Sequence, residues 1–169
     1  MKTTIIAGFP GVGKTYAAKH IHDYPEFEKM HVVDLESSEY GWIYDENGQK
    51  IRNPEWPKNY VDAIIEQYVL SSNLHHQVRG KKRYILISTH QEVLESLAKI
   101  DGIDLIIFKP KTKKVAMQRY VERGSSKEFI KSIDENWDKY MKSLDCVARE
   151  FDNIHLYISD EPLLEFLTV

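Results

Sequence analysis

The stretch Gly8-Phe9-Pro10-Gly11-Val12-Gly13-Lys14-Thr15 decides the fold of this 169-residue chain. It satisfies the pattern G-x-x-x-x-G-K-[ST], follows the apolar run Thr3 to Ala7, and precedes a helix-like run from Tyr16. Glycines at these positions let successive backbone N–H groups curl around phosphate oxygens, and the helix that follows adds its partly positive N-terminus. In this strand, loop and helix context the pattern predicts a phosphate-binding loop.

Two side chains of this loop have specific expected roles. Lys14 should neutralise charge on the β- and γ-phosphates, and Thr15 should place its hydroxyl on a Mg²⁺ ion that bridges them. The sequence therefore predicts ATP with Mg²⁺ as the ligand. The expected nucleotide-binding residues are Gly8, Pro10, Gly11, Val12, Gly13, Lys14, Thr15 and Tyr16.

Short β-branched or aliphatic runs alternate along the chain with helical patterns, which is typical of a parallel sheet covered on both faces. Apolar residues at helical spacing predict two amphipathic helices, one around 60–69 and one around 129–144. Capping-box patterns at Thr89 and Ser125 place further helix starts near His90 and Ser126. We expect strands at about 3–7, 31–35, 83–88, 104–108 and 154–158.

Residues 37–58 interrupt this alternation with an aromatic insert. Asn47-Gly48 between two apolar pairs predicts a hairpin or a tight turn. A segment of this length inside a compact domain is usually functional, so we expect an acceptor-binding flap; a surface hairpin whose aromatic side chains cap the core is the alternative. The expected acceptor-contacting residues are Glu36, Ser37, Tyr40, Trp42 and Trp56.

Two carboxylates stand at the end of the second expected strand. Asp34 and Glu36 are two residues apart, so their side chains point the same way, into the crevice where open α/β sheets bind ligands. There they can hold water on a metal or accept a hydroxyl proton, with Asp34 as the expected metal-binding and catalytic carboxylate. A solvated strand end is the alternative. The third strand ends in Ser88, where an acid is expected in many phosphate-loop proteins, so either Ser88 positions the metal's water or Asp34 supplies the carboxylate.

Positive charge gathers in the segment from 109 to 131, which holds eight bases and two acids. Residues 23–66 have the opposite balance, eleven acids and four bases. Arg119 and Arg123 are four residues apart on one helix and can clamp a transferring phosphoryl group. We therefore expect residues 109–126 to form a lid with both arginines catalytic; a solvated basic face is the alternative.

The composition excludes several classes of protein. A net charge of −3 argues against duplex nucleic acid or an anionic membrane as partner. No apolar segment is long enough for an export signal or a membrane span, so we expect a single cytoplasmic domain over 1–169, as a monomer or a homodimer. The single cysteine, Cys146, is expected to be a buried structural thiol.

The phosphate loop, the Asp34 to Ser38 strand end, the aromatic insert and the R-x-x-x-R-G run at Arg119 to Gly124 resemble, in this order, the small P-loop nucleoside and nucleotide kinases of the adenylate-kinase-like group. The chain also resembles small nucleotide-kinase-like ATP-binding proteins of phages and bacteria, and Asp34-Leu35-Glu36 is similar to the paired acids of shikimate-type kinases. The resemblance implies a three-layer α/β/α sandwich with a five-stranded parallel sheet in the order 2-3-1-4-5. The Asp-Gly-Phe-Pro-Arg run of adenylate kinases is absent, which argues against AMP as acceptor.

These features predict an ATP- and Mg²⁺-dependent phosphotransferase acting on a small acceptor, with a (deoxy)nucleoside or its monophosphate favoured. A non-enzymatic or slowly hydrolysing ATP-binding regulatory module is a second hypothesis, because Ser88 replaces the usual acid. A 5′-hydroxyl polynucleotide kinase is a third.

Overall fold

The computed structural model describes residues 3–73 and 82–168. Five parallel strands form its main sheet in the order β2-β5-β1-β6-β7. Numbered along the chain, these five strands have the order 2-3-1-4-5, so the predicted topology is confirmed. The strands are β1 (Thr3–Gly8), β2 (Met30–Asp34), β5 (Lys82–Ile87), β6 (Leu105–Lys109) and β7 (Ile154–Ile158).

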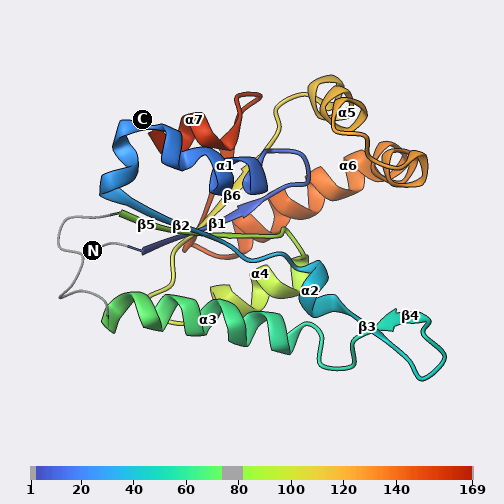
Figure 1. Ribbon diagram of the computed structural model, residues 1–169, viewed down its shortest axis with the longest axis horizontal. Helices are drawn as coiled ribbons and strands as arrows, with labels where there is room; N and C mark the ends of the chain where they lie inside the picture. Colours follow the sequence, from blue (N-terminus) through green and yellow to red (C-terminus); the bar gives the residue numbers. More distant parts are fainter. Residues whose placement is uncertain (1–2, 74–81, 169) are drawn as a thin grey trace.

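Helices cover both faces of this sheet. Figure 1 shows α3 (Lys58–Asn73) and α4 (Gln91–Ala98) on one face, and α1 (Lys14–His20) and α7 (Leu163–Thr168) on the other. The fold is therefore a three-layer α/β/α sandwich. The other helices are α2 (Ser38–Gly41), α5 (Lys113–Glu122), α6 (Lys127–Glu150) and two 3₁₀ turns, Ile21–Asp23 and Pro25–Lys29.

The central strands read as continuous apolar runs because both of their faces are buried. Ile5, Ile6 and Ala7 of β1 have no exposed surface, and neither do the facing Ile85 and Ile87 of β5. Burial of this kind fixes the strands in register, so the residues that follow each strand collect at one edge of the sheet. The phosphate loop and the acidic strand end meet at that edge.

The longest helix, α6, confirms the predicted amphipathic pattern. Ile133, Trp137, Leu144 and Val147 are its buried residues, spaced by four, seven and three positions. Cys146 lies on its exposed side, so the prediction of a buried thiol was wrong. Cys146 immediately precedes the buried Val147, and consecutive residues of a helix point in different directions. Its side chain therefore points away from the core.

Two predicted helix caps are shifted by one residue. Helix α6 is capped by Ser126, whose side chain accepts a hydrogen bond from the Phe129 amide, while Ser125 accepts one from Arg123 Nε. Helix α4 begins after His90, not after Thr89, and has no side-chain cap. Neighbouring polar residues offer nearly equal caps, so tertiary contacts decide between them.

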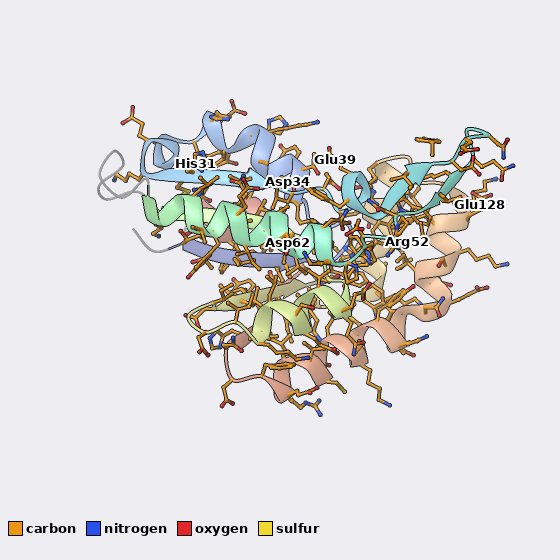
Figure 2. All side chains as sticks on the ribbon, turned by 90° about the horizontal axis from the view of Figure 1, so that it is seen from below. His31, Asp34, Glu39, Arg52, Asp62 and Glu128 are labelled. Atoms are coloured by element: carbon orange, nitrogen blue, oxygen red, sulfur yellow. The ribbon has the colours of Figure 1, made fainter. Side chains whose placement is uncertain are left out.

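The aromatic insert forms the predicted hairpin. Strand β3 (Trp42–Tyr44) pairs antiparallel with β4 (Lys50–Arg52), and Gly48 at the turn has φ 73°. The hairpin extends past the carboxyl edge of the main sheet, at the end of the molecule where α6 begins (Figures 1 and 2). Among the described helices, none combines the length and apolar content that a membrane crossing requires.

Candidate functional site

The phosphate loop has the backbone that its glycines predict. Gly11 and Gly13 have φ values of 82° and 94°, and Gly13 immediately precedes α1. Residues with a side chain rarely adopt these angles, so the glycines are needed for the shape of the loop. Gly11 also faces Tyr120 of α5, whose ring edge would lie 2.5 Å from a Cβ atom placed there.

The Lys14 ammonium lies inside this loop. Its Nζ donates to the Gly8 carbonyl oxygen at 2.8 Å. Burial lowers the pKa of Lys14, the neighbouring Asp34 and Glu36 carboxylates act in the opposite direction, and Arg123 adds to the lowering. A polyphosphate brought to this loop would stabilise the ammonium form, because opposite charge favours the ionised group.

Thr15 joins the loop to the acidic end of β2. Its Oγ1 lies 2.9 Å from Asp34 Oδ2 and 2.9 Å from Glu36 Oε1. A hydroxyl has one proton to donate, so it cannot satisfy both carboxylates at once. The second carboxylate contact requires either a proton on one carboxyl group or a cation among the three oxygens.

Asp34 is the more buried of the two acids. Desolvation raises its pKa, the Thr15 hydrogen bond acts in the opposite direction, and the Glu36 charge adds to the rise. Its other oxygen, Oδ1, is buried without a hydrogen-bond partner among the described residues. Such an oxygen is costly unless something else binds it.

This oxygen set suits Mg²⁺, which takes hard oxygen ligands and usually uses one or two carboxylates together with substrate phosphates and waters. Thr15 and Asp34 would hold the ion, with Glu36 beside them. Among residues 3–73 and 82–168 no group of three or more His, Cys, Asp or Glu side chains could hold a metal by itself. A protein-only metal cage is thus absent from the described part of the chain, and a magnesium nucleotide matches the donors that are present.

A cavity of about 1130 Å³ lies beside these residues; Thr15 and Glu36 line it, and Asp34 does not. It has room for a nucleotide together with a second small molecule, since single-ligand pockets commonly occupy about 300–1,000 Å³. Five parts of the chain line it. They are the phosphate loop with the start of α1, the residues after β2, the residues after β5 with the start of α4, the end of α5, and one side of α6.

Most predicted nucleotide-binding residues line this cavity. Gly8, Pro10, Gly11, Gly13, Lys14, Thr15 and the exposed Tyr16 all do. Val12 does not, since it is 1% exposed and packs behind the loop, where its carbonyl oxygen accepts from the Leu163 amide.

Arg119 and Arg123 both line the cavity, as residues of a clamp would. Arg119 lies in α5 and donates to the Asp160 carbonyl oxygen. Arg123 follows the last helical residue, and its guanidinium lies 5.1 Å from the Tyr120 ring centre and 5.4 Å from that of Phe129. The two arginines therefore approach the cavity from different local structures.

Helix α5 packs directly on the phosphate loop. The Tyr120 hydroxyl donates to the Pro10 carbonyl oxygen at 2.6 Å, and burial raises the pKa of this fully buried tyrosine to about 12. The Asp160 carboxylate accepts from the backbone amides of Lys111 and Thr112, which ties the other end of the lid segment to the loop after β7. Tyr120 was not among the predicted site residues, although an aromatic residue between two arginines was a visible signal.

A second tyrosine joins the ends of β2 and β5. The Tyr60 hydroxyl donates to the Leu35 carbonyl oxygen at 2.7 Å and accepts from the Ser88 amide at 3.1 Å. Burial raises its pKa to about 12, so the phenol stays neutral and fixes both strand ends. The helical pattern marked Tyr60 as a core residue and gave no signal of this polar role.

Ser88, the residue at the usual acid position, contacts an imidazole. Ser88 Oγ and His90 Nδ1 lie 2.6 Å apart, and both residues line the cavity. Burial lowers the pKa of His90, with Arg52 and Lys14 adding to the shift and Glu92 opposing it. The pair therefore presents neutral hydrogen-bonding groups at neutral pH.

The predicted acceptor-contacting residues are divided. Glu36 and Ser37 line the cavity, whereas Tyr40, Trp42 and Trp56 lie outside its lining. Trp56 stacks on Tyr60 with ring centres 5.4 Å apart, and its Nε1 donates to Glu92 at 3.0 Å.

Tyr40 also packs on Tyr60, with ring centres 5.1 Å apart, while Trp42 is 42% exposed on the hairpin. Arg52, labelled in Figure 2, lies over both tryptophans. Two of these three aromatic side chains thus support the strand ends that carry the site.

Comparison with known proteins leaves the family open. No family model matches the chain, and no curated protein matches it. Among solved structures, the chain is similar to the tunicamycin resistance protein of Deinococcus radiodurans, with a TM-score of 0.54 and 17% identity over 98% of this chain and 94% of that one. At this identity the likeness shows a shared α/β fold.

Proposed function

We propose that the protein is an ATP- and Mg²⁺-dependent phosphotransferase that acts on a small acceptor. The observation that carries this proposal is the sharing of the Thr15 hydroxyl by Asp34 and Glu36 directly beside the Lys14 ammonium. Phosphoryl transfer is catalysed mainly by positioning the reactants and neutralising their charge. The phosphate loop, with its Lys14 ammonium and the two adjacent carboxylates, can supply both. The shared α/β fold is compatible with this activity.

At the donor end, the backbone amides of the phosphate loop and the Lys14 ammonium bind the β- and γ-phosphates. Thr15 and Asp34 would hold a magnesium ion, which would supply charge neutralisation on those phosphates. Arg119 and Arg123 approach from the α5 side, where they can bind oxygens of the transferring group.

At the acceptor end, the residues after β2 and β5 face the γ-phosphate position. The acceptor hydroxyl oxygen forms a bond to the γ-phosphorus, and the bond from that phosphorus to the bridging β–γ oxygen breaks. ADP keeps the electron pair of the broken bond, and the hydroxyl proton passes to the Asp34 or Glu36 carboxylate and then to solvent. The neutral Ser88 and His90 pair can orient the hydroxyl.

The test is ADP formation from ATP and Mg²⁺ with a panel of nucleosides, nucleoside monophosphates, small alcohols and 5′-hydroxyl oligonucleotides. We expect ADP to form only with an acceptor, together with a phosphorylated product detected by mass spectrometry. ATP binding without acceptor-dependent ADP would instead support the regulatory module, and transfer confined to oligonucleotides would support the polynucleotide kinase.

The two arginines provide a matched test of the clamp. Arg119→Ala and Arg123→Ala should each lower kcat at least about tenfold, because a positioned donor to the developing charge is lost. Lys114→Ala is the control, since Lys114 is exposed on the same helix and does not line the cavity. Equal, mild effects of all three substitutions would show that the basic segment is a solvated face.

A further inference from the structure

The cavity continues past the phosphate loop into a space between α4 and α6. We call this space the α4–α6 chamber and define it by Phe9, Gln91, Glu92, Ile133, Tyr140 and Leu144, all of which line the cavity. Its position at the carboxyl ends of β1 and β5 places it next to the acceptor side of the site.

One wall of the chamber is apolar and firmly packed. Ile133 and Leu144 are 7% and 3% exposed, and Phe9, from the phosphate loop, is 3% exposed. The Phe9 ring meets the Trp137 ring edge-on with centres 5.7 Å apart, and its centre lies 6.3 Å from that of Tyr140. A wall of this kind binds an apolar or aromatic body by removing its surface from water.

The other wall belongs to the start of α4 and is polar without positive charge. Glu92 bears a carboxylate that accepts from Trp56 Nε1. Gln91 and Ser143 join the two helices, with Ser143 Oγ 2.6 Å from Gln91 Oε1. These groups can hydrogen-bond a hydroxyl or an amide, and the carboxylate repels an anion.

Most of the positive charge that lines the cavity comes from the phosphate loop and the end of α5. Lys14 and Arg123 are close enough for Arg123 to lower the pKa of the lysine, and Arg119 also lines the cavity. Among the described lining residues near the chamber, Lys139 is the cation, and its side chain is exposed. A triphosphate would engage Lys14, Arg119 and Arg123, which leaves Lys139 for a second phosphate among the described lysines and arginines of the lining.

Arg52 is another cation on this side of the molecule, and its guanidinium is already engaged. It lies 4.4 Å from the Trp56 ring centre and 5.1 Å from that of Trp42, and it does not line the cavity. Cation–π contacts with two indoles engage it on the hairpin, outside the cavity lining.

We infer that the α4–α6 chamber binds the acceptor and selects a neutral hydroxyl compound with an aromatic or other apolar body over a phosphorylated one. This inference rests on the proposed phosphotransferase activity, and it decides between the two acceptor classes that the sequence favoured. The apolar wall holds the body of the acceptor, and the hydroxyls of Ser37, Ser88 and Thr89, which line the same cavity, can guide its hydroxyl.

The first experiment compares probes that differ by one phosphate. Transfer from ATP and Mg²⁺ is measured with thymidine, thymidine 5′-monophosphate and 4-nitrobenzyl alcohol. Binding of each probe is measured separately by calorimetry, with the protein saturated by Mg²⁺ and a non-hydrolysable ATP analogue. We expect both neutral probes to bind and react, with kcat/KM at least about tenfold above that of the monophosphate.

Two substitutions with matched controls test the walls. Glu92→Gln keeps an oxygen for Trp56 Nε1 and removes the negative charge, so the preference for thymidine over its monophosphate should fall several-fold. Glu95→Gln, one turn further along α4 and outside the lining, likewise keeps an oxygen for its donor, Gln91 Nε2, and should leave the ratio unchanged. Ile133→Ala should raise KM for the neutral probes several-fold without changing ATP affinity, whereas Ile130→Ala on the same helix should not.

The possible results separate the chamber from the chemistry. If the monophosphate binds or reacts better than thymidine, or if neither neutral probe binds, the chamber inference is overturned even when transfer occurs. If neutral probes bind in an Ile133-dependent way but no product forms, the chamber is supported and the proposed phosphotransferase activity fails. Should Arg52→Ala selectively abolish use of the monophosphate, a phosphate site on the hairpin would replace the inference.

Discussion

At the scale of single residues, the Thr15 hydroxyl has one proton and cannot donate it to both Asp34 and Glu36. The negative charge of Asp34 therefore needs a positive group to balance it. We predict that Asp34→Asn lowers kcat by about 100-fold or more, because the amide keeps the shape but cannot bear the charge that holds the metal or accepts a proton. ATP affinity, measured by calorimetry with Mg²⁺, should change much less.

Glu39→Gln is the control for this substitution, since Glu39 affects the Asp34 pKa only through its charge and is exposed. Figure 2 shows Glu39 near Asp34 at the same end of β2. If Asp34→Asn keeps full turnover while Glu36→Gln loses it, the roles of the two carboxylates are reversed.

His90 gives the protein a pH-dependent stability. Burial lowers its pKa below the ordinary 6.5, so the folded chain binds fewer protons than the unfolded chain between that lowered pKa and about pH 6.5. Stability contributed by neutral His90 is therefore present above pH 6.5 and is lost on acidification. Melting temperatures between pH 7.5 and 5 should fall less steeply in His90→Gln than in the wild type. His155→Gln, on the exposed side of β7, should keep the wild-type slope.

At the scale of elements, the contact of α5 with the phosphate loop supports the shape of that loop, because Tyr120 packs on Gly11 and donates to Pro10. We predict that Gly11→Ala weakens ATP binding at least tenfold, because φ 82° disfavours alanine and the new Cβ atom would lie 2.5 Å from Tyr120 Cε1. The tyrosine ring is fully buried and bonded to Pro10, so it has little room to move. Calorimetric titration with Mg²⁺ and ATP measures the effect.

Gly48→Ala separates backbone strain from the steric clash. Gly48 has a similar φ of 73°, but nothing lies within 4 Å of its Cβ position. This variant should lose about 1–2 kcal/mol of stability at most and bind ATP normally. Equal losses of ATP affinity in both variants would rule out the packing of Tyr120 as the cause.

The elements themselves were predictable to different degrees. Buried strands such as β1 and β5 could be predicted from the sequence, because a strand that is buried on both faces needs an uninterrupted apolar run. The helix starts near 90 and 126 were placed within one residue, yet their caps were misassigned where two polar residues adjoin. Tyr60 and Tyr120 were missed as site-supporting residues, because helical periodicity reports that a side chain is buried and says nothing of where its hydroxyl points.

At the scale of the whole molecule, the cavity joins parts of the chain that are distant in sequence. The Asp34 position followed from strand polarity, because parallel strands bring their carboxyl ends to one edge. The chamber between α4 and α6 did not follow, since it depends on how closely two helices pack over that edge. Sequence patterns give the faces of such helices but not the space left between them.

The same architecture couples ligand binding to global stability. Because the phosphate loop, β2 and α5 meet only in the folded chain, we expect Mg²⁺ with ATP to bind the native state alone and to stabilise it by mass action. At an ATP concentration of 100 times Kd, we predict about 2.7 kcal/mol and a rise in Tm of about 5 to 11 °C. Mg²⁺ without nucleotide should give a much smaller rise.

Lys14→Ala, which loses a charge-assisted contact worth about 1.5–3 kcal/mol, should retain only about 0.3–1.3 kcal/mol of stabilisation at the same ATP concentration. Lys19→Ala, an exposed position on the same helix, should retain all of it. Differential scanning calorimetry of each variant with and without ligand makes the comparison, and an unchanged ATP-dependent shift in Lys14→Ala would contradict the assignment of the phosphate loop.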